Sequence, residues 1–495
     1  MALALSIGWG VRGNRGHEYG AMIPGALSAM AAAIVSGRED WRRRVAYFAF
    51  FGALGWSFGG SMSYGRVLGY AHSDSLADVL YGFACTYAIG FLWGAIGGAG
   101  LALAACLDRK RLAEFFPPLI AIFAIWIAWD YVLLWGLLSK EQAKRLNWHG
   151  ADWIGAGSAL LVLLFFLLKQ RRPGFAVSLM LHMAAGWWLG MLALVQGMGL
   201  HMTPPRSDNW AGCVGMAAAM LWFLHRRGMP AAVFAALVVG LASGLGFATG
   251  LLIRVGGHAS KIATNWHSLM EQSFGFIAGL GVAIAMGHLS TRLPPLADHT
   301  EGARWTETFS LLFVLLGITY VNIVKNVLVD PWIPNRVVPA ELYGIPAYWW
   351  FNFAYLALAA VVGAIVLAHP RRNIAALPPA ALGRAQIMMV VFLWWIVIGN
   401  LSRYLPFHPV RLVTEGVIHL NACLLTALLL LAPHPGEAPP LQGELPRGWV
   451  RKAAIASLAA GLCAALLYTA VVLPLQDAPD AAARFRFGPR ALEGW

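Results

Sequence analysis

The sequence contains few charged residues. Asp, Glu, Lys and Arg together make up 12% of its 495 residues, roughly half the share of a typical soluble domain. Apolar and aromatic residues make up 59%. A chain with so little charge cannot cover the surface of soluble domains of this total length, so a multidomain soluble protein is excluded. The composition indicates an integral membrane protein.

Cysteine and several common motifs are also scarce or absent. All five cysteines lie in apolar runs and none belongs to a CxxC pair, so a disulfide framework and a cysteine zinc site are not expected. The chain lacks a Walker A loop and a CxxCH haem motif. The apolar stretch 2–9 has no basic flank or cleavage site, so we do not expect it to be a signal peptide. The sequence therefore predicts no cofactor and no metal site.

Long apolar runs dominate the remaining sequence. A helix needs about 20 mostly apolar residues to cross a bilayer, and fourteen segments meet this requirement, which predicts an all-α, polytopic membrane protein. The candidate segments are 18–36, 45–63, 79–106, 115–138, 152–168, 175–197, 209–225, 230–253, 269–287, 307–328, 347–367, 385–401, 413–432 and 453–473.

The loops between these segments alternate in charge. More than half of the 36 Lys and Arg residues lie in alternate, compact loops, which include 38–44, 107–113, 169–174, 226–229 and 369–384. Positively charged loops stay in the cytoplasm. We therefore expect these loops to be cytoplasmic, both termini to lie outside, and the protein to reside in a bacterial inner membrane.

A weak internal repeat divides the chain. A basic residue followed by an acidic one precedes the first, seventh and thirteenth segments, at Arg15–Glu18, Arg206–Asp208 and Arg411–Glu415. A period of six helices is even, so the repeats are parallel, as in some transporters. Chance similarity among apolar helices is the alternative. The predicted units are a first repeat with a glycine-rich N-terminal loop at 1–207, a second repeat at 208–412, two additional helices at 413–473 and a tail at 474–495.

The glycine-rich segment 8–20 is the first candidate site. Five of its thirteen residues are glycine, which lets a backbone approach a ligand closely. Arg12, Arg15 and His17 precede a predicted helix start that begins near Glu18, and the N–H groups of a helix start favour anions. The pattern predicts a loop that binds an anionic or zwitterionic group. A structural cap with an Arg15–Glu18 ion pair is the alternative.

Two similar segments each carry an arginine at an outer helix end with a histidine after it. These pairs are Arg66 with His72 and Arg254 with His258. An arginine can bind a carboxylate or phosphate in a bidentate manner, although it can also extend towards lipid headgroups.

Other polar residues interrupt apolar runs. Glu271 follows His267 by four residues, and Glu415 precedes His419 by four residues. This spacing places each pair on one helix face and suits a proton relay, a metal site or a structural pair. Polar groups inside predicted spans usually have a function, which adds a final set of candidates: Asp130, Asn322 and Lys325.

These features favour a secondary transporter for a small polar or anionic solute, with proton coupling as one option. The alternatives are a membrane-embedded transferase for acyl, glycosyl or phospho groups with an extracytoplasmic active site, which would act on a lipid-linked or polar substrate, and a structural subunit of a membrane complex. The lipid bilayer and the solute are the expected partners, and nucleic acid is not one. The candidate solute-binding residues are Arg12, Arg15, His17, Glu18, Arg66, His72, Asp130, Arg254, His258, Glu271, Asn322, Lys325, Arg411 and Glu415.

Overall fold

The chain is described here by a computed structural model. The described residues are 1–12, 18–62, 64–134, 139, 141–142, 146, 148–170, 173–202, 208–296, 304–322, 339–368, 380–404, 412–432, 440–443 and 448–475. The side chains of Glu18, Arg66 and Asp130 are outside this description although their backbones are within it.

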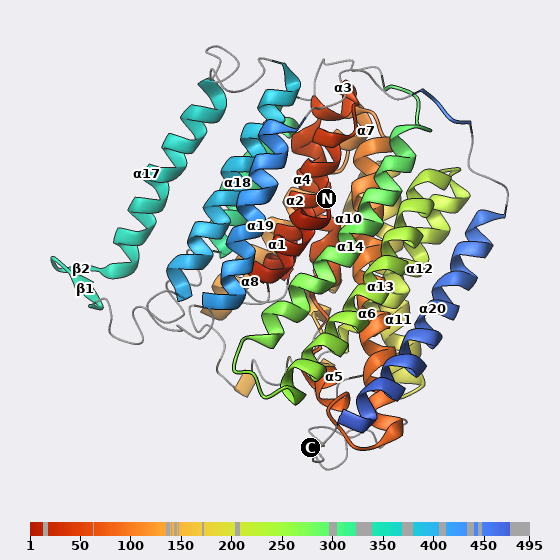
Figure 1. Ribbon diagram of the computed structural model, residues 1–495. Helices are drawn as coiled ribbons and strands as arrows, with labels where there is room; N and C mark the ends of the chain where they lie inside the picture. Colours follow the sequence, from red (N-terminus) through yellow and green to blue (C-terminus); the bar gives the residue numbers. More distant parts are fainter. Residues whose placement is uncertain are drawn as a thin grey trace.

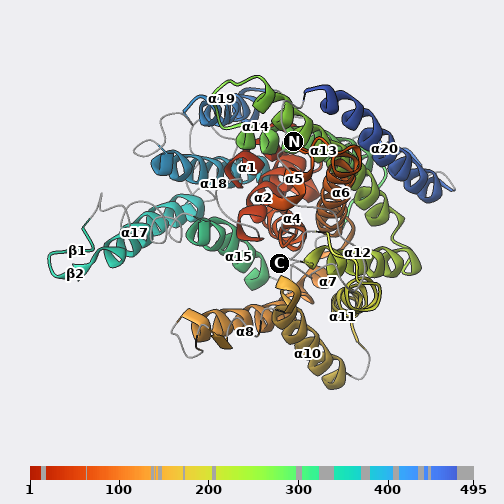
Figure 2. The same ribbon diagram turned by 90° about the horizontal axis from the view of Figure 1, so that it is seen from below.

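A group of helices packs around the short helix α1 at the centre of the bundle (Figures 1 and 2). Residues 4–12 of α1 are all buried. No predicted span covers this segment, so the sequence analysis missed α1. The central helices are α1 (Ala2–Arg12), α2 (Glu18–Val35), α4 (Val45–Gly60), α6 (Leu76–Cys106), α13 (Pro230–Ala259) and α14 (Trp266–Ser290).

The remaining long helices surround this group (Figure 2). They are α8 (Phe116–Leu134), α10 (Trp153–Lys169), α11 (Phe175–Gly190) continued by a π-helical turn η2 (Met191–Gly197), α12 (Asn209–Arg226), α15 (Arg304–Leu312) continued by a π-helical turn η3 (Phe313–Ile318), α17 (Ala347–Ala368), α18 (Ala381–Tyr404), α19 (Leu412–Leu431) and α20 (Trp449–Val472).

Short elements connect the long helices. Strands β1 and β2 form a small antiparallel hairpin in which Glu341 pairs with Pro346. The short elements are α3 (Glu39–Arg42), α5 (Gly65–Tyr70), α7 (Arg109–Ala113), η1 (Trp148–Gly150), β1 (Glu341–Leu342), β2 (Ile345–Pro346) and η5 (Leu473–Leu475).

Glycine allows the central helices to approach closely. On α6, Gly90, Gly94 and Gly98 recur at four-residue spacing and face α13; a Cβ atom on Gly94 would lie 2.4 Å from the carbonyl oxygen of Val239. Gly8 of α1 is similar, because a Cβ atom there would lie 2.4 Å from Cα of Pro24 in α2. Small residues at such crossings are typical of membrane helix packing. Residues 8–12, predicted as part of a binding loop, are therefore helical and tightly packed.

The outer helices expose large apolar side chains. Leu168 of α10 and Leu458 of α20 are 86% and 77% exposed. Apolar surfaces that extend over many helices are unfavourable in water but favourable in contact with lipid. Nine helices of the described chain are long and apolar enough to cross a membrane, and three further apolar helices are shorter. Each of the fourteen predicted segments coincides with a helix over its described residues, although 115–138 is described only as far as 134 and 307–328 only as far as 322. The chain is an all-α, multi-pass membrane protein.

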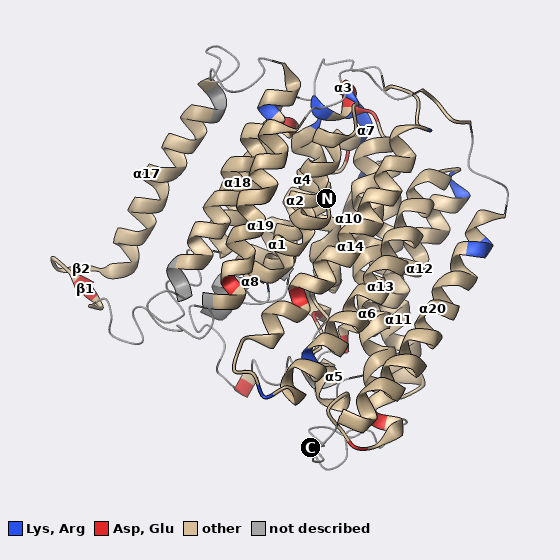
Figure 3. Cartoon of the chain, in the orientation of Figure 1, with Lys and Arg blue, Asp and Glu red and all other residues tan. Residues whose placement is uncertain are grey.

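Two of the predicted basic loops, 38–44 and 107–113, lie together at one end of the bundle, the upper end in Figure 3, which we call the basic end. Arg38 donates to the carbonyl of Leu293 and Arg109 to that of Arg43. Arg109 also pairs with Glu307 at 3.1 Å. Loops that are far apart in the sequence therefore contact one another at this end. The candidate site described next lies at the opposite end.

Candidate functional site

Arg12, the last residue of α1, lies among aromatic rings near the end of the bundle opposite the basic end. Its side chain is 3% exposed. The guanidinium carbon lies 5.2 Å from the ring centroids of Trp9, Tyr64 and Trp93. Such contacts stabilise a cation out of water. The ring of Phe274 adds to this aromatic wall around Arg12, because its centroid lies 4.6 Å from that of Trp9.

The positive charge of Arg12 is opposed by Glu271 in the second turn of α14. Nη1 of Arg12 lies 3.2 Å from Oε1 of Glu271 and donates a 2.7 Å hydrogen bond to the Tyr64 hydroxyl. Tyr64 in turn donates to Oε1 of Glu271. His267, one helical turn before Glu271, has Nε2 3.4 Å from the Tyr64 hydroxyl and 3.9 Å from Oε1. We call Arg12, Tyr64, His267 and Glu271 the Arg12–Glu271 cluster.

Burial makes this cluster energetically costly. The side chain of Glu271 is 0% exposed, and its Oε2 atom has no hydrogen-bond partner among the described residues. Burial also raises the pKa of the Tyr64 hydroxyl, which keeps that hydroxyl protonated as the donor to Glu271. A buried ion pair is rarely retained for stability alone, because apolar side chains fill the same space at lower cost. A proton, or a hydrogen-bond donor of a ligand, can bind at this Oε2 atom, beside the Oε1 atom that pairs with Arg12.

A second basic group lies next to this cluster. Nη1 of Arg254, in the last third of α13, donates to Nε2 of His72 at 2.8 Å, and the His72 ring lies 5.4 Å from that of His258. Phe247 lies two helical turns before Arg254 on the same face of α13, and its ring centroid is 5.1 Å from that of Tyr64, so Arg254 lies on the side of α13 that faces the cluster. The structure therefore brings together five of the predicted residues: Arg12, His72, Arg254, His258 and Glu271.

Two other predicted residues lie around the junction of α1 and α2. Nδ2 of Asn322 donates to the carbonyl of Tyr19, near the start of α2, at 2.9 Å. Glu415 is 1% exposed and accepts a 2.9 Å hydrogen bond from Asn400; its helix, α19, packs against α1. The expected Glu415–His419 pair is joined through the main chain, because Nδ1 of His419 bonds to the carbonyl of Glu415.

The other predicted site residues are less informative. Arg15, His17, Lys325 and Arg411 lie outside the described residues, as do the side chains of Glu18 and Arg66. The side chain of Asp130 is also not described, but its helix, α8, packs against α10 at the edge of the bundle, away from α1 (Figure 2). The structure does not place the Asp130 helix beside Arg12.

Sequence reasoning missed the aromatic wall of the site. Trp9 precedes Arg12 by three residues, a spacing that places both on one helix face, but this signal depends on identifying α1 as a helix. Trp93 carries no comparable signal, because it reaches Arg12 from the middle of α6.

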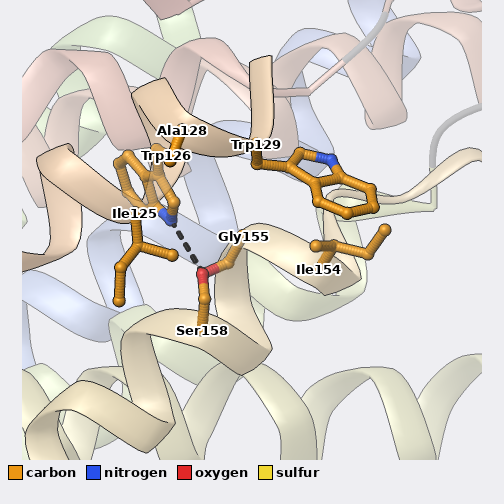
Figure 4. Close-up of a pocket in the computed structure, with 7 residues that line it drawn as sticks. All are labelled: Ile125, Trp126, Ala128, Trp129, Ile154, Gly155 and Ser158. Carbon is orange, nitrogen blue, oxygen red and sulfur yellow. Dashed lines mark hydrogen bonds between the residues drawn. The ribbon is translucent and has the colours of Figure 1, made fainter. Parts of the chain in front are cut away.

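A separate pocket of about 310 Å³ lies between α8 and α10 (Figure 4). Its walls are mostly apolar, and include Ile125, Trp129 and Ile154. The indole nitrogen of Trp126 already donates to the carbonyl of Gly155 at 3.0 Å. This pocket offers no charged group to a polar solute, so the buried charges around Arg12 remain the candidate site.

Comparison with known proteins does not assign the chain to a family. No protein-family model, curated protein or solved structure matches it.

Proposed function

We propose that the chain is a secondary transporter for a small polar or anionic solute, with the Arg12–Glu271 cluster as its solute and proton site. The observation that carries this proposal is the buried Arg12–Glu271 pair, held 3.2 Å apart at 3% and 0% exposure. Ionisable groups in such positions in membrane proteins commonly mark solute pathways and proton relays.

Competition for one guanidinium supports proton coupling. An anionic group that binds Arg12 competes with Glu271 for the guanidinium, whose Nη1 lies 3.2 Å from the carboxylate. A displaced, charged carboxylate would be costly in this apolar setting, so displacement is favourable when Glu271 takes up a proton. Tyr64 and His267, both within hydrogen-bonding range of one another, provide a route for that proton. Solute and proton then bind together, which is the basis of symport.

The burial of the site supports alternating access. Water reaches neither side chain of the pair to any extent, so a solute binds only after the helices around the site move. His267, 34% exposed, is the member of the cluster nearest to solvent. We further propose that the fourteen predicted segments all span the membrane, that segments one to six and seven to twelve form a parallel repeat, and that the basic end faces the cytoplasm of a bacterium.

A transferase remains the second candidate because of one observation. The described buried arginines at the basic end bind mostly to main-chain carbonyls, as Arg42 does to Ile34, whereas the Arg12–Glu271 cluster and the His72–Arg254 pair lie at the opposite end. A one-sided site suits an enzyme that acts on a lipid-linked or extracytoplasmic substrate. His267 would then be the general base.

Accessibility from the two membrane faces distinguishes these candidates without knowledge of the solute. In a variant without its native cysteines, His267→Cys is treated with a membrane-impermeant thiol reagent in right-side-out and inside-out vesicles. Alternating access predicts labelling from both faces. Labelling from one face alone supports the transferase and contradicts transport.

Two control positions define the faces. Arg43→Cys, at a side chain 56% exposed on the basic end, reacts from the cytoplasmic face. Ile262→Cys, at a side chain 61% exposed in the turn between α13 and α14, reacts from the outer face. Reaction of Arg43→Cys from outside would reverse the proposed orientation.

A further inference from the structure

A second buried cluster, formed by His149, His201 and Asp208, lies where α10 and α12 begin and where the π-helical turn η2 ends. Nδ1 of His201 lies 2.7 Å from Oδ2 of Asp208, and Nδ1 of His149 lies 3.8 Å from the same oxygen. One ligand atom from each residue falls within 4.8 Å of the others. The three side chains are 17%, 5% and 4% exposed, respectively.

The backbone and a neighbouring side chain direct His149 towards Asp208. His149 has a φ of 52°, a left-handed conformation that is uncommon and costly for a residue other than glycine. Nε2 of His149 lies 3.3 Å from Oε1 of Gln196. When Nε2 carries the proton and donates to this oxygen, Nδ1 presents a lone pair to the Asp208 carboxylate. Two electron-rich atoms that face each other in a buried site repel unless a cation lies between them.

Hydrogen bonds fix the positions of these residues. The amide of Asp208 donates to the carbonyl of His149 at 3.1 Å. Asn209 donates to Oδ2 of Asp152 at 2.6 Å and accepts from the Asp152 amide at 2.9 Å. The loop before α10 is thus joined to the start of α12. Such a frame holds ligands in place before an ion binds.

The charge balance also favours a cation. No Lys or Arg among the described residues forms an ion pair with Asp208. The charge of the carboxylate at neutral pH is therefore opposed, within the described chain, by imidazoles alone.

We propose that His149, His201 and Asp208 bind a divalent transition-metal ion, with Zn²⁺ the best fit. Tetrahedral Zn²⁺ binds nitrogen and oxygen at about 2.0–2.1 Å, which separates neighbouring ligand atoms by about 3.4 Å. The observed separations of 2.7 and 3.8 Å lie on either side of that value, so small side-chain movements complete the site. Three protein ligands leave a fourth position for water or a solute group. This site is independent of the proposed transport role.

The spacing of these residues explains why the sequence predicted no metal site. His149 and Asp208 are separated by two predicted spans, and neither belongs to a short ligand motif. The fold, not the local sequence, brings the three together.

Metal binding to the purified full-length protein tests the proposal. After treatment with a chelator, the protein is titrated with Zn²⁺, and with Co²⁺ as a probe whose visible spectrum reports four-coordinate ligation. We expect one tight equivalent of Zn²⁺ and a four-coordinate Co²⁺ spectrum. His149→Ala, the most exposed ligand variant, should lower the affinity by more than about 100-fold, and Gln196→Ala, which removes the partner of His149, by about 10–100-fold. His288→Ala, a histidine at the basic end that packs against Phe234, is the matched control and should bind as the wild type does.

Two outcomes would overturn the site. If the wild type binds Zn²⁺ no more tightly than His149→Ala does, the His201–Asp208 hydrogen bond is purely structural. If His288→Ala loses as much affinity as His149→Ala, the metal binds elsewhere. Because the ligand variant and the control are compared by their melting temperatures without metal, a folding defect is separated from a binding defect.

Discussion

The two ends of the bundle use buried arginine in different ways. At the basic end, Arg38 is 1% exposed and donates to both carboxylate oxygens of Asp40 at 2.8 Å. It also donates to three main-chain carbonyls in and after the last turn of α14, those of Ser290, Leu293 and Pro294. At the opposite end, Arg12 is equally buried, but its described partners are the side chains of Glu271 and Tyr64 and three aromatic rings.

This difference separates a structural role from a functional one. Main-chain carbonyls at the end of a helix need donors, and they cannot leave Arg38 unless the helix end unfolds. A carboxylate and a phenol can exchange partners, because a rotamer change or a proton is enough. Burial alone therefore does not identify a site; the exchangeability of the partners does. The predictions below test this comparison.

The largest effect is expected for Arg38→Ala. The substitution leaves several carbonyls and the Asp40 carboxylate without their donor in a buried setting, which should lower the free energy of unfolding by about 3–5 kcal/mol. Thermal unfolding in detergent measures the change. An effect below about 1 kcal/mol would show that water replaces the guanidinium and that Arg38 is not a structural clamp.

A smaller loss is expected for Arg12→Met, because the remaining Glu271 can take up a proton and become neutral. We expect about 2–3 kcal/mol, from one buried polar group left without its partner. The double variant Arg12→Met with Glu271→Leu should recover most of this stability, while the proposed transport activity stays absent. If the double variant is as unstable as the single one, the pair is a structural element like Arg38 and the comparison fails.

The sequence was sufficient to predict the long apolar helices but not the short helix α1 or the contacts between helices. Apolar composition and length identify α6 or α13 because a membrane span has to satisfy both. The short helix α1 escaped prediction, since residues 2–12 are too few to span a bilayer and gain their stability from tertiary packing. Glu271 was a candidate from its spacing to His267, whereas its main partner, Arg12, is 259 residues away. Nothing in local sequence encodes such a contact.

The contribution of Asp40 to the free energy of unfolding depends on pH and tests the same comparison. Its expected size lies between those of Arg12 and Arg43. Burial by itself would raise the pKa of Asp40, but the hydrogen bonds and charge of Arg38, the hydrogen bond from the Leu296 amide and the charge of Arg44 together outweigh burial and lower the pKa. A carboxyl with a lowered folded-state pKa stabilises the fold fully above the unfolded value of about 3.9, and this stabilisation disappears as the pH falls through the folded-state value.

We therefore expect Asp40→Asn to cost about 1–2 kcal/mol, with little change between pH 8 and pH 5. Below about pH 4 the difference between wild type and variant should shrink. Unfolding measured across this range checks the prediction. A difference that grows as the pH falls would mean that the Asp40 carboxylate is destabilised in the fold, contrary to its contacts with Arg38.

The smallest effect is expected for a third kind of arginine, Arg43, which lies in the same loop as Arg38. Its side chain is 56% exposed and pairs with Glu39 at 3.3 Å, four residues earlier on a helical turn. Exposed pairs of this kind contribute about 0.3–0.5 kcal/mol, because water and salt screen the charges. Arg43→Ala should therefore change the free energy of unfolding by less than about 0.5 kcal/mol, and that small change should vanish in high salt.

Unfolding of Arg43→Ala and Arg38→Ala in the same detergent, at low and high salt, provides the comparison. If Arg43→Ala approached Arg38→Ala in cost, the net positive charge of the loop would be its stabilising feature, and the hydrogen bonds of Arg38 to main-chain carbonyls would not explain why that residue is buried.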